Sequence, residues 1–264
     1  MGAGEVSNVR LLYIDIETAP IEAYVWSIWD QNVGLNQIIK DWAVLSVAWM
    51  FEGDQMQYAD NRECMDPRDD RVLMSLVWKA LDEADLVCTQ NGNSFDIRKL
   101  NARFITLGMP PPSTYRCIDT KIVAKQALAL TSHKLEFMAE KIAGVKKSPH
   151  KEFPGFELWT EVLKGNRRAW AVMERYNKQD VRATRALYLK LRPWAKTHPN
   201  MGQYMESNIP VCPKCGGKKV HARGYSYTTA GKYRRYACLT CGGWSKGIDN
   251  LLEKSKRKSL LRGE

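Results

Sequence analysis

The order of the apolar segments along the chain constrains its fold more than any other feature. Three stretches with strand character come first, at residues 9–16, 42–51 and 55–59. Helical and strand patterns then alternate from residue 70 to residue 192. The first three strands are expected to form an antiparallel meander, and the alternation places helices on both faces of the sheet. The sequence therefore predicts an α/β fold with a mixed β-sheet flanked by helices.

The remaining pattern divides the chain into parts. Helices are expected at residues 70–83, 95–107, 119–130, 134–143, 156–163 and 168–192, and short strands at 85–89 and 115–118. Proline, asparagine and glycine are frequent in residues 194–210, which is typical of a linker. The predicted organisation is an α/β domain at 1–195, a linker at 196–210, a small cysteine-bearing β domain at 211–250 and a basic tail at 251–264.

The positive charge of the chain is concentrated near its C-terminus. The formal net charge is +11, of which residues 206–264 carry +9. A basic module attached to a nearly neutral one favours a polyanionic partner, most often nucleic acid. A solvated tail that promotes solubility is the alternative. Residues 1–10 lack the apolar run of a signal peptide, and no stretch is long and apolar enough for a membrane span.

Two acidic residues stand close together in the first predicted strand. Asp15 and Glu17 are two positions apart, so their side chains share one face, while Ile14 and Ile16 turn into the core. Carboxylates are uncommon inside strands, and two on one face suit the binding of a hard cation. Taken alone, such a pair more often marks an exposed strand end.

Two further acidic residues lie at helix positions far along the chain. Asp96 falls in the first turn of the helix that follows the Asn91-Gly92 turn, where a carboxylate also complements the helix dipole. Asp180 lies four residues after Tyr176 on the long helix, so the phenol and the carboxylate face the same way. Each element has an ordinary structural alternative when it is considered by itself.

Together, these three elements resemble the exonuclease motifs of the DEDD superfamily. The chain carries D-x-E at Asp15 to Glu17, N-x-x-x-F-D at Asn91 to Asp96, and Y-x-x-x-D at Tyr176 to Asp180. Arg175 stands where the histidine subtype has its histidine, so the tyrosine subtype is the match. The second motif is similar to that of proofreading domains of B-family DNA polymerases. The resemblance covers about residues 9–192 and implies a ribonuclease-H-like fold, in a stand-alone relative of the kind found in bacteria and phages.

The resemblance also implies an activity, which is 3′→5′ hydrolysis of nucleic acid, preferably DNA, to nucleoside 5′-monophosphates. Its metal ligands, for two Mg²⁺ or Mn²⁺ ions, would be Asp15, Glu17, Asp96 and Asp180. Tyr176 would orient the attacking water, and Asn91 and Phe95 would contact the nucleic acid. The expected partner is nucleic acid with a single-stranded or frayed 3′ end, and a replication protein is a second candidate partner.

Two Cys-x-x-Cys pairs predict a separate metal site. Each pair offers two thiolates from a tight turn, and four thiolates make a closed, structural zinc site; the cysteines are Cys212, Cys215, Cys238 and Cys241. A redox dithiol pair and an iron–sulfur cluster are the alternatives. The pattern resembles a zinc ribbon and favours a reducing compartment, so a cytoplasmic location is expected.

A β-hairpin is expected between the two cysteine pairs, around residues 229–231. It interleaves tyrosines with cations, a composition that suits stacking on bases and contact with phosphates. The tyrosines could instead complete the core of a very small domain. The cations predicted to contact nucleic acid are Lys218, Lys219, Arg223, Arg234 and Arg235.

Two other functions remain open from the sequence. One is a structure-specific endonuclease on the same fold, which would cut circular single-stranded DNA. The other is a nucleic-acid-binding adaptor without catalysis, in which binding would persist without hydrolysis under any metal. The complete set of four carboxylates with Tyr176 favours an enzyme.

Overall fold

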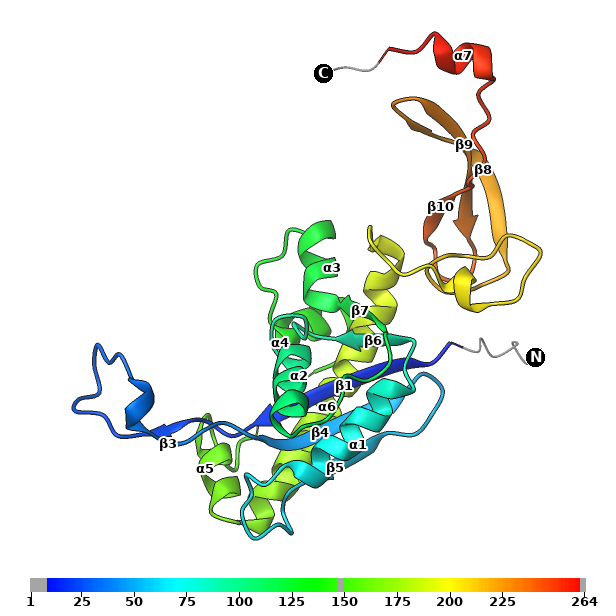
Figure 1. Cartoon of the computed structure of the whole chain (residues 1–264). Coiled ribbons are helices and arrows are strands. Elements are labelled where there is room, and N and C mark those ends of the chain that lie inside the picture. Colours follow the sequence, from blue (N-terminus) through cyan, green and yellow to red (C-terminus); the bar gives the residue numbers. More distant parts are fainter. Residues whose placement is uncertain (1–8, 147–149, 262–264) are drawn as a thin grey trace.

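The central element of the computed structural model is a five-stranded mixed sheet with the order β5-β4-β1-β6-β7 (Figure 1). The structure describes residues 9–146 and 150–261. The strands of this sheet are β1 (Leu11–Thr18), β4 (Val44–Phe51), β5 (Gln57–Asp60), β6 (Leu86–Thr89) and β7 (Arg116–Asp119).

The directions of the strands follow the predicted topology. β4 is antiparallel to both of its neighbours, β1 and β5, and the three strands form the expected meander. β6 is parallel to β1, and β7 is parallel to β6. The carboxyl ends of β1, β6 and β7 therefore meet at one edge of the sheet, where ligands of open α/β sheets commonly bind.

Helices cover both faces of this sheet, as predicted. Those of the large domain are α1 (Arg71–Asp82), α2 (Asp96–Thr106), α3 (Thr120–Ala127), α4 (Leu135–Met138), α5 (Glu157–Leu163) and α6 (Arg167–Leu191). The apolar residues of α1 and α2 pack on one face, and those of α3, α4 and the second half of α6 pack on the other. The first half of α6 packs with α5 in a third cluster. This arrangement confirms the predicted fold class.

The alternation of side chains along β1 decides which helix each of them meets. Leu12, Ile14 and Ile16 lie in the cluster with α1 and α2. Leu11 and Tyr13 lie in the cluster with Val181 and Leu187 of α6 and so face that helix. Asp15 and Glu17 continue the α6-facing side of the strand because successive residues alternate between faces. β1 runs two residues beyond the predicted end, so both carboxylates lie within the strand.

Several local features differ from the expectation. The predicted α4 continues into a π-helical segment, η2 (Ala139–Ala143), which ends at Gly144 with a φ of 69°. α3 ends three residues early because Leu128 adopts an extended conformation and packs on the core with Leu130. Residues between β1 and β4 form a projecting arm that contains β2 (Glu22–Ala23), η1 (Leu35–Gln37) and β3 (Ile38–Lys40) (Figure 1).

The C-terminal part contains a three-stranded sheet with the order β10-β9-β8. The hairpin pairs β8 (Val220–Thr228) with β9 (Gly231–Cys238), as predicted, and β10 (Trp244–Lys246) pairs with the far side of β9. The helical segments of this part are η3 (Arg192–Trp194), η4 (Met201–Tyr204) and α7 (Lys254–Lys258).

The segment predicted as a linker is partly packed. Met201 is buried in the core cluster that contains the end of α6, and Tyr204 packs against the same cluster. The Met201 N–H also donates to the carbonyl of Pro213 at 2.8 Å. The apolar side chains within this glycine- and proline-containing stretch therefore join the large domain to the cysteine module. Among the described residues, no helix has both the length and the apolar character needed to cross a bilayer.

One buried ion pair connects α1, α2 and β4. Asp70 has no exposed surface, and it accepts hydrogen bonds from Arg103 Nε at 2.8 Å and from the Val44 N–H at 2.9 Å. Removing Arg103 leaves this carboxylate buried without its counter-charge, so we expect Arg103→Ala to lower the free energy of unfolding by about 3 kcal/mol. Urea denaturation measures the change.

The neighbouring pair supplies the control. Arg71 bonds Asp69 at 2.6 Å on the exposed surface, so Arg71→Ala should change stability little. Equal losses in the two variants would contradict the assignment of a special role to the buried pair.

Candidate functional site

Three carboxylates converge at the carboxyl end of β1. Oxygen atoms of Asp15, Glu17 and Asp180 all lie within 4.8 Å of one another. β1 supplies Asp15 and Glu17, and the middle of α6 supplies Asp180. α6 packs on the face of β1 that carries the two carboxylates. Oxygen ligands at this spacing suit a hard divalent cation, so the three residues could hold a metal ion.

The electrostatics of this group fit that role. The pKa of Asp15 is raised well above its usual value by burial of the carboxylate and by the negative charges of Asp180, Asp96 and Glu17. Glu17 and Asp180 are also buried, with exposed fractions of 9% and 6%. Like charges that are held together without a cation are unfavourable, and a divalent ion would offset the repulsion.

Asn177 orients Asp15, and the sequence analysis did not identify it. Its Nδ2 donates to Asp15 Oδ2 at 2.6 Å and to the Asp15 carbonyl at 3.1 Å. Its Oδ1 accepts from Ser46 Oγ at 3.2 Å, and its side chain is fully buried. Asn177 therefore ties α6 to β1 and β4 directly behind the carboxylates. In the sequence, only its position three residues before Asp180 on the same helix could have indicated that Asn177 belongs to the site.

Asp96 lies beside the group of three and is held differently. It is 3% exposed at the first residue of α2, and its Oδ1 accepts the Ile16 N–H at 3.2 Å. β1 pairs with β6 only over Leu11–Tyr13, so beyond that point this side of β1 has no strand partner. Burial raises the pKa of Asp96 to about 7, against the effect of two backbone hydrogen bonds.

The turn before Asp96 is shaped by Asp119. Its carboxylate accepts the N–H groups of Asn91 at 3.0 Å and Asn93 at 3.2 Å, and it also caps α3 through the Lys121 N–H at 2.9 Å. Asn91 has a φ of 67°, and a Cβ on Gly92 would lie 2.3 Å from Thr89 Oγ1. The turn therefore requires glycine at position 92. Asp119 therefore both caps α3 and supports this turn.

Tyr176 lies one helical turn before Asp180 on the same face of α6. Its ring forms edge contacts with His150, at 5.2 Å between centroids, and with Trp159, at 6.3 Å. The three rings form a small aromatic cluster beside the carboxylates. His150 was not identified from the sequence because it has no recognisable spacing to the other site residues.

Asn91 and Phe95, which were predicted to contact nucleic acid, lie in the turn before α2. Asn91 Oδ1 accepts from Lys121 Nζ at 3.1 Å. Phe95 is 38% exposed, and Lys99 Nζ lies 5.4 Å from its ring and 3.7 Å from the ring of Trp42. Lys99 and Trp42 also line a pocket of about 420 Å³, and Thr18, the residue after Glu17, is part of the same lining.

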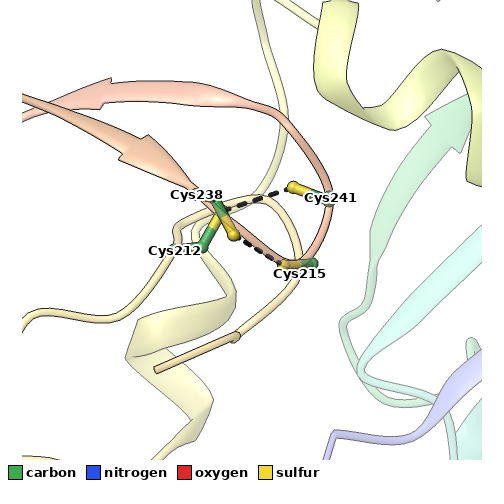
Figure 2. A group of neighbouring side chains, drawn as sticks. All are labelled: Cys212, Cys215, Cys238 and Cys241. Atoms are coloured by element: carbon green, nitrogen blue, oxygen red, sulfur yellow. Dashed lines mark hydrogen bonds between the residues drawn. The ribbon is translucent and has the colours of Figure 1, made fainter. Parts of the chain in front are cut away.

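The four cysteines of the C-terminal module form one cluster, as predicted (Figure 2). The sulfur atoms of Cys212 and Cys241 are 3.7 Å apart, and those of Cys215 and Cys238 are 3.6 Å apart. A tetrahedral zinc ion with Zn–S bonds of about 2.3 Å requires sulfurs roughly 3.8 Å apart. The donor set and its dimensions therefore fit a closed zinc site.

Neighbouring groups favour the thiolate form of one of these cysteines, Cys212. Hydrogen bonding from Cys215, and from the N–H groups of Lys214 and Cys215, lowers the pKa of the Cys212 thiol to about 4, against the effect of burial. The thiolate is the form that binds a metal. The basic residues predicted to contact nucleic acid, Lys218, Lys219, Arg223, Arg234 and Arg235, are all exposed on this module.

The sequence of residues 12–192 matches the profile of the RNase_H superfamily. The chain belongs to that superfamily. In this RNase_H-type domain, the mixed sheet, its flanking helices and the carboxylates at its edge agree with the assignment. RNase_H-type nucleases use divalent metals, and the acidic group is the place where this chain could hold one. No curated protein matches the chain in sequence.

A solved structure supports the fold of this RNase_H-type chain. It is that of the family B DNA polymerase from the hyperthermophilic archaeon Pyrobaculum calidifontis, which superposes with a TM-score of 0.50 at 19% identity. The match covers 70% of this chain and 25% of that polymerase. The likeness concerns the fold alone, and it confirms the predicted similarity to a B-family polymerase at that level.

The raised pKa of Asp96 predicts how stability depends on pH. The usual pKa of Asp is about 3.9, so the folded, metal-free protein binds this proton more tightly than the unfolded chain does. Stability is therefore lost as the pH rises from about 4 to about 7. Asp96→Asn removes the loss, so at pH 8 with chelator it should be more stable than the wild type by on the order of 1–4 kcal/mol.

The same denaturation series contains its control. At pH 4, where the wild-type Asp96 is protonated, the two proteins should differ much less. Mg²⁺ at pH 8 should stabilise the wild type more than the variant. A variant that is less stable than the wild type at pH 8 without metal would assign Asp96 a structural role.

The cysteine cluster predicts one zinc ion per chain. Cys238→Ser should lose the zinc and the protection of amides in β8 and β9 from hydrogen exchange, because the module has few buried apolar residues of its own. Metal analysis and hydrogen exchange measure both effects. Cys64→Ser, outside the cluster, is the control and should keep its zinc. Full protection without zinc would contradict the structural role of the metal.

Proposed function

We propose that this chain is a metal-dependent 3′→5′ exonuclease of the DEDD type, tyrosine subtype, which releases nucleoside 5′-monophosphates from nucleic acid. The observation that carries the proposal is the convergence of Asp15, Glu17 and Asp180, with Asp96 bonded to the backbone between the first two. Divalent ions bound there would supply the activation of water and the stabilisation of the leaving 3′-oxygen. Four nearby carboxylates provide the ligands for two such ions.

Other residues of the chain would orient the metal ligands, the attacking water and the end of the nucleic-acid strand. Asn177 fixes the orientation of Asp15, because both of its amide hydrogens are used on that residue. Tyr176 would place its phenol beside the attacking water. With an ordinary pKa near 10 for this residue type, it serves to orient water better than to remove a proton. The pocket lined by Trp42, Lys99 and Trp159 is also lined by Thr18, the residue after Glu17. It offers aromatic rings and one cation to the end of a nucleic-acid strand.

DNA is the proposed substrate because one solved structure with a similar fold is that of a DNA polymerase. The basic C-terminal module, held by a structural zinc ion, would bind the same strand away from its 3′ end. The many cysteines without disulfides suit the cytoplasm, where we propose that the enzyme acts, with a replication protein as a further candidate partner.

The test uses single-stranded oligonucleotides of DNA and RNA, labelled at the 5′ end, with Mg²⁺, Mn²⁺ or chelator. The wild type should shorten the DNA stepwise from its 3′ end, and only with metal. Asp15→Asn should reduce the rate by more than about 100-fold, because even outer partners of a metal site are worth 10–100-fold. Asp30→Asn, on the exposed arm, is the matched control and should keep full activity.

Circular single-stranded DNA separates the proposal from its alternative on the same fold. An exonuclease leaves the circle intact, whereas a structure-specific endonuclease opens it. Binding of oligonucleotides without hydrolysis under any of these metals would identify a non-catalytic adaptor and refute the enzyme.

A further inference from the structure

The sheet of the C-terminal module carries cations and no carboxylates. The strands β8, β9 and β10 contain no Asp or Glu, and they contain five cations: Arg223, Lys232, Arg234, Arg235 and Lys246. In the described part of this sheet, the charge is therefore not neutralised by neighbours within the strands. Several of the cations lie over aromatic rings instead.

The strand register divides these residues between two faces. Tyr225 pairs with Arg234 and Tyr227 with Lys232, so these four residues share one face, here called the tyrosine face. Lys246 pairs with Arg235 and Trp244 with Ala237, which puts Trp244, Arg235 and Lys246 on the opposite face. Tyr233 lies there by alternation along β9. We call this side the tryptophan face.

A β-bulge brings one more arginine to the tryptophan face. The register of β8 shifts between Ala222 and Tyr225, and the Arg223 guanidinium lies 5.6 Å from the ring of Trp244. The Arg235 guanidinium lies 4.7 Å from the same ring, and its Nε donates to the Arg223 carbonyl at 3.0 Å. The tryptophan, which is 45% exposed, is thus flanked by two cations that are held in place.

The end of the sheet that carries Trp244 lies next to the large domain. A Cβ on Gly243, the residue before Trp244, would lie 3.6 Å from Pro193 Cα, directly after α6. Lys214 Nζ donates to the Pro193 carbonyl at 2.5 Å across the same junction. The tyrosines of the opposite face lie toward the hairpin tip, which points away from the large domain (Figure 1).

We infer that the tryptophan face is a binding site for single-stranded DNA, several nucleotides 5′ of the bond that is hydrolysed. Trp244 stacks on a base, and Arg223, Arg235 and Lys246 contact the phosphates on either side of it. The inference rests on the proposed function, because that function is the reason for choosing single-stranded DNA as the ligand. It assigns a role to Trp244 and Lys246, and it separates Arg235 from Arg234, which points to the other face.

The length of α6 sets the reach between the two sites. From Asp180 to Pro193 the chain runs thirteen residues, nearly all helical, which corresponds to roughly 20 Å at about 1.5 Å per residue. A stacked strand covers that distance in about six nucleotides, at about 3.4 Å each. Short oligonucleotides that occupy the carboxylate site therefore cannot reach Trp244.

The test measures binding of labelled oligothymidylates of four and fifteen nucleotides to the full chain, loaded with zinc and made inactive by Asp15→Asn. Trp244→Ala should weaken binding of the fifteen-nucleotide strand by about 5- to 100-fold, the range for one lost stacking contact. Binding of the four-nucleotide strand should not change. Trp244→Phe should restore most of the affinity.

Tyr225→Ala is the matched control, because Tyr225 also lies beneath two cations but on the opposite face. It should leave both affinities nearly unchanged. Arg235→Gln should reduce the slope of log affinity against log salt by about 0.7, whereas Arg234→Gln should not. Zinc content, measured for each variant, identifies any loss of folding.

Equal effects of Trp244→Ala and Tyr225→Ala, or of Arg235→Gln and Arg234→Gln, would overturn the inference. If Trp244→Ala loses zinc, the two arginine variants decide, and an unchanged salt slope in Arg235→Gln overturns it. Hydrolysis of the four-nucleotide strand by the wild type tests the proposed function separately. If the wild type binds the oligonucleotides as expected but does not hydrolyse them, the proposed exonuclease activity is refuted. The assignment of the tryptophan face as a binding site then still holds.

Discussion

The repulsion among buried carboxylates at the end of β1 is the constraint on which the rest of the site depends. Asp15, Glu17 and Asp180 are held within 4.8 Å by elements that are buried for other reasons, since β1 is the central strand and α6 packs along it. Asn177 and the Ile16 N–H add fixed hydrogen bonds to Asp15 and Asp96. The fold thus maintains an arrangement of like charges that is unfavourable without a cation. A bound cation removes this repulsion, which increases its affinity for the site.

The same helix connects the two metal-binding parts of the molecule. α6 carries Tyr176 and Asp180 in its middle, and its C-terminal end leads to Pro193, whose carbonyl accepts from Lys214 inside the first cysteine pair. Arg192 lies over the ring of Tyr188, 5.6 Å from its centroid. Against the effect of burial, Tyr188 and then Cys215 and Cys241 raise the pKa of Arg192. The cysteine module is therefore fixed to the end of the helix that supplies the catalytic candidates.

Much of this arrangement could be predicted because it follows from local rules. Strand alternation gave the shared face of Asp15 and Glu17, helical spacing gave that of Tyr176 and Asp180, and the cysteine spacing gave the cluster. Asn177 could not be found in this way, because a buried asparagine on a helix has no periodic pattern and its partner, Asp15, is 162 positions away. The packing of Met201 was missed because the glycine and prolines around it indicate a loop, whether or not that loop is buried.

The face of the sheet on which Arg223 lies could not be predicted from the sequence, because it depends on one bulge. In a regular strand, Arg223, Tyr225 and Tyr227 would share a face, since they are two positions apart. The shift between Ala222 and Tyr225 moves Arg223 to the side of Trp244 while Tyr225 stays opposite Arg234. Such a shift changes which charges a strand of nucleic acid meets without changing the composition of the module. This backbone irregularity adds a third cation, Arg223, to the face that already carries Trp244, Arg235 and Lys246.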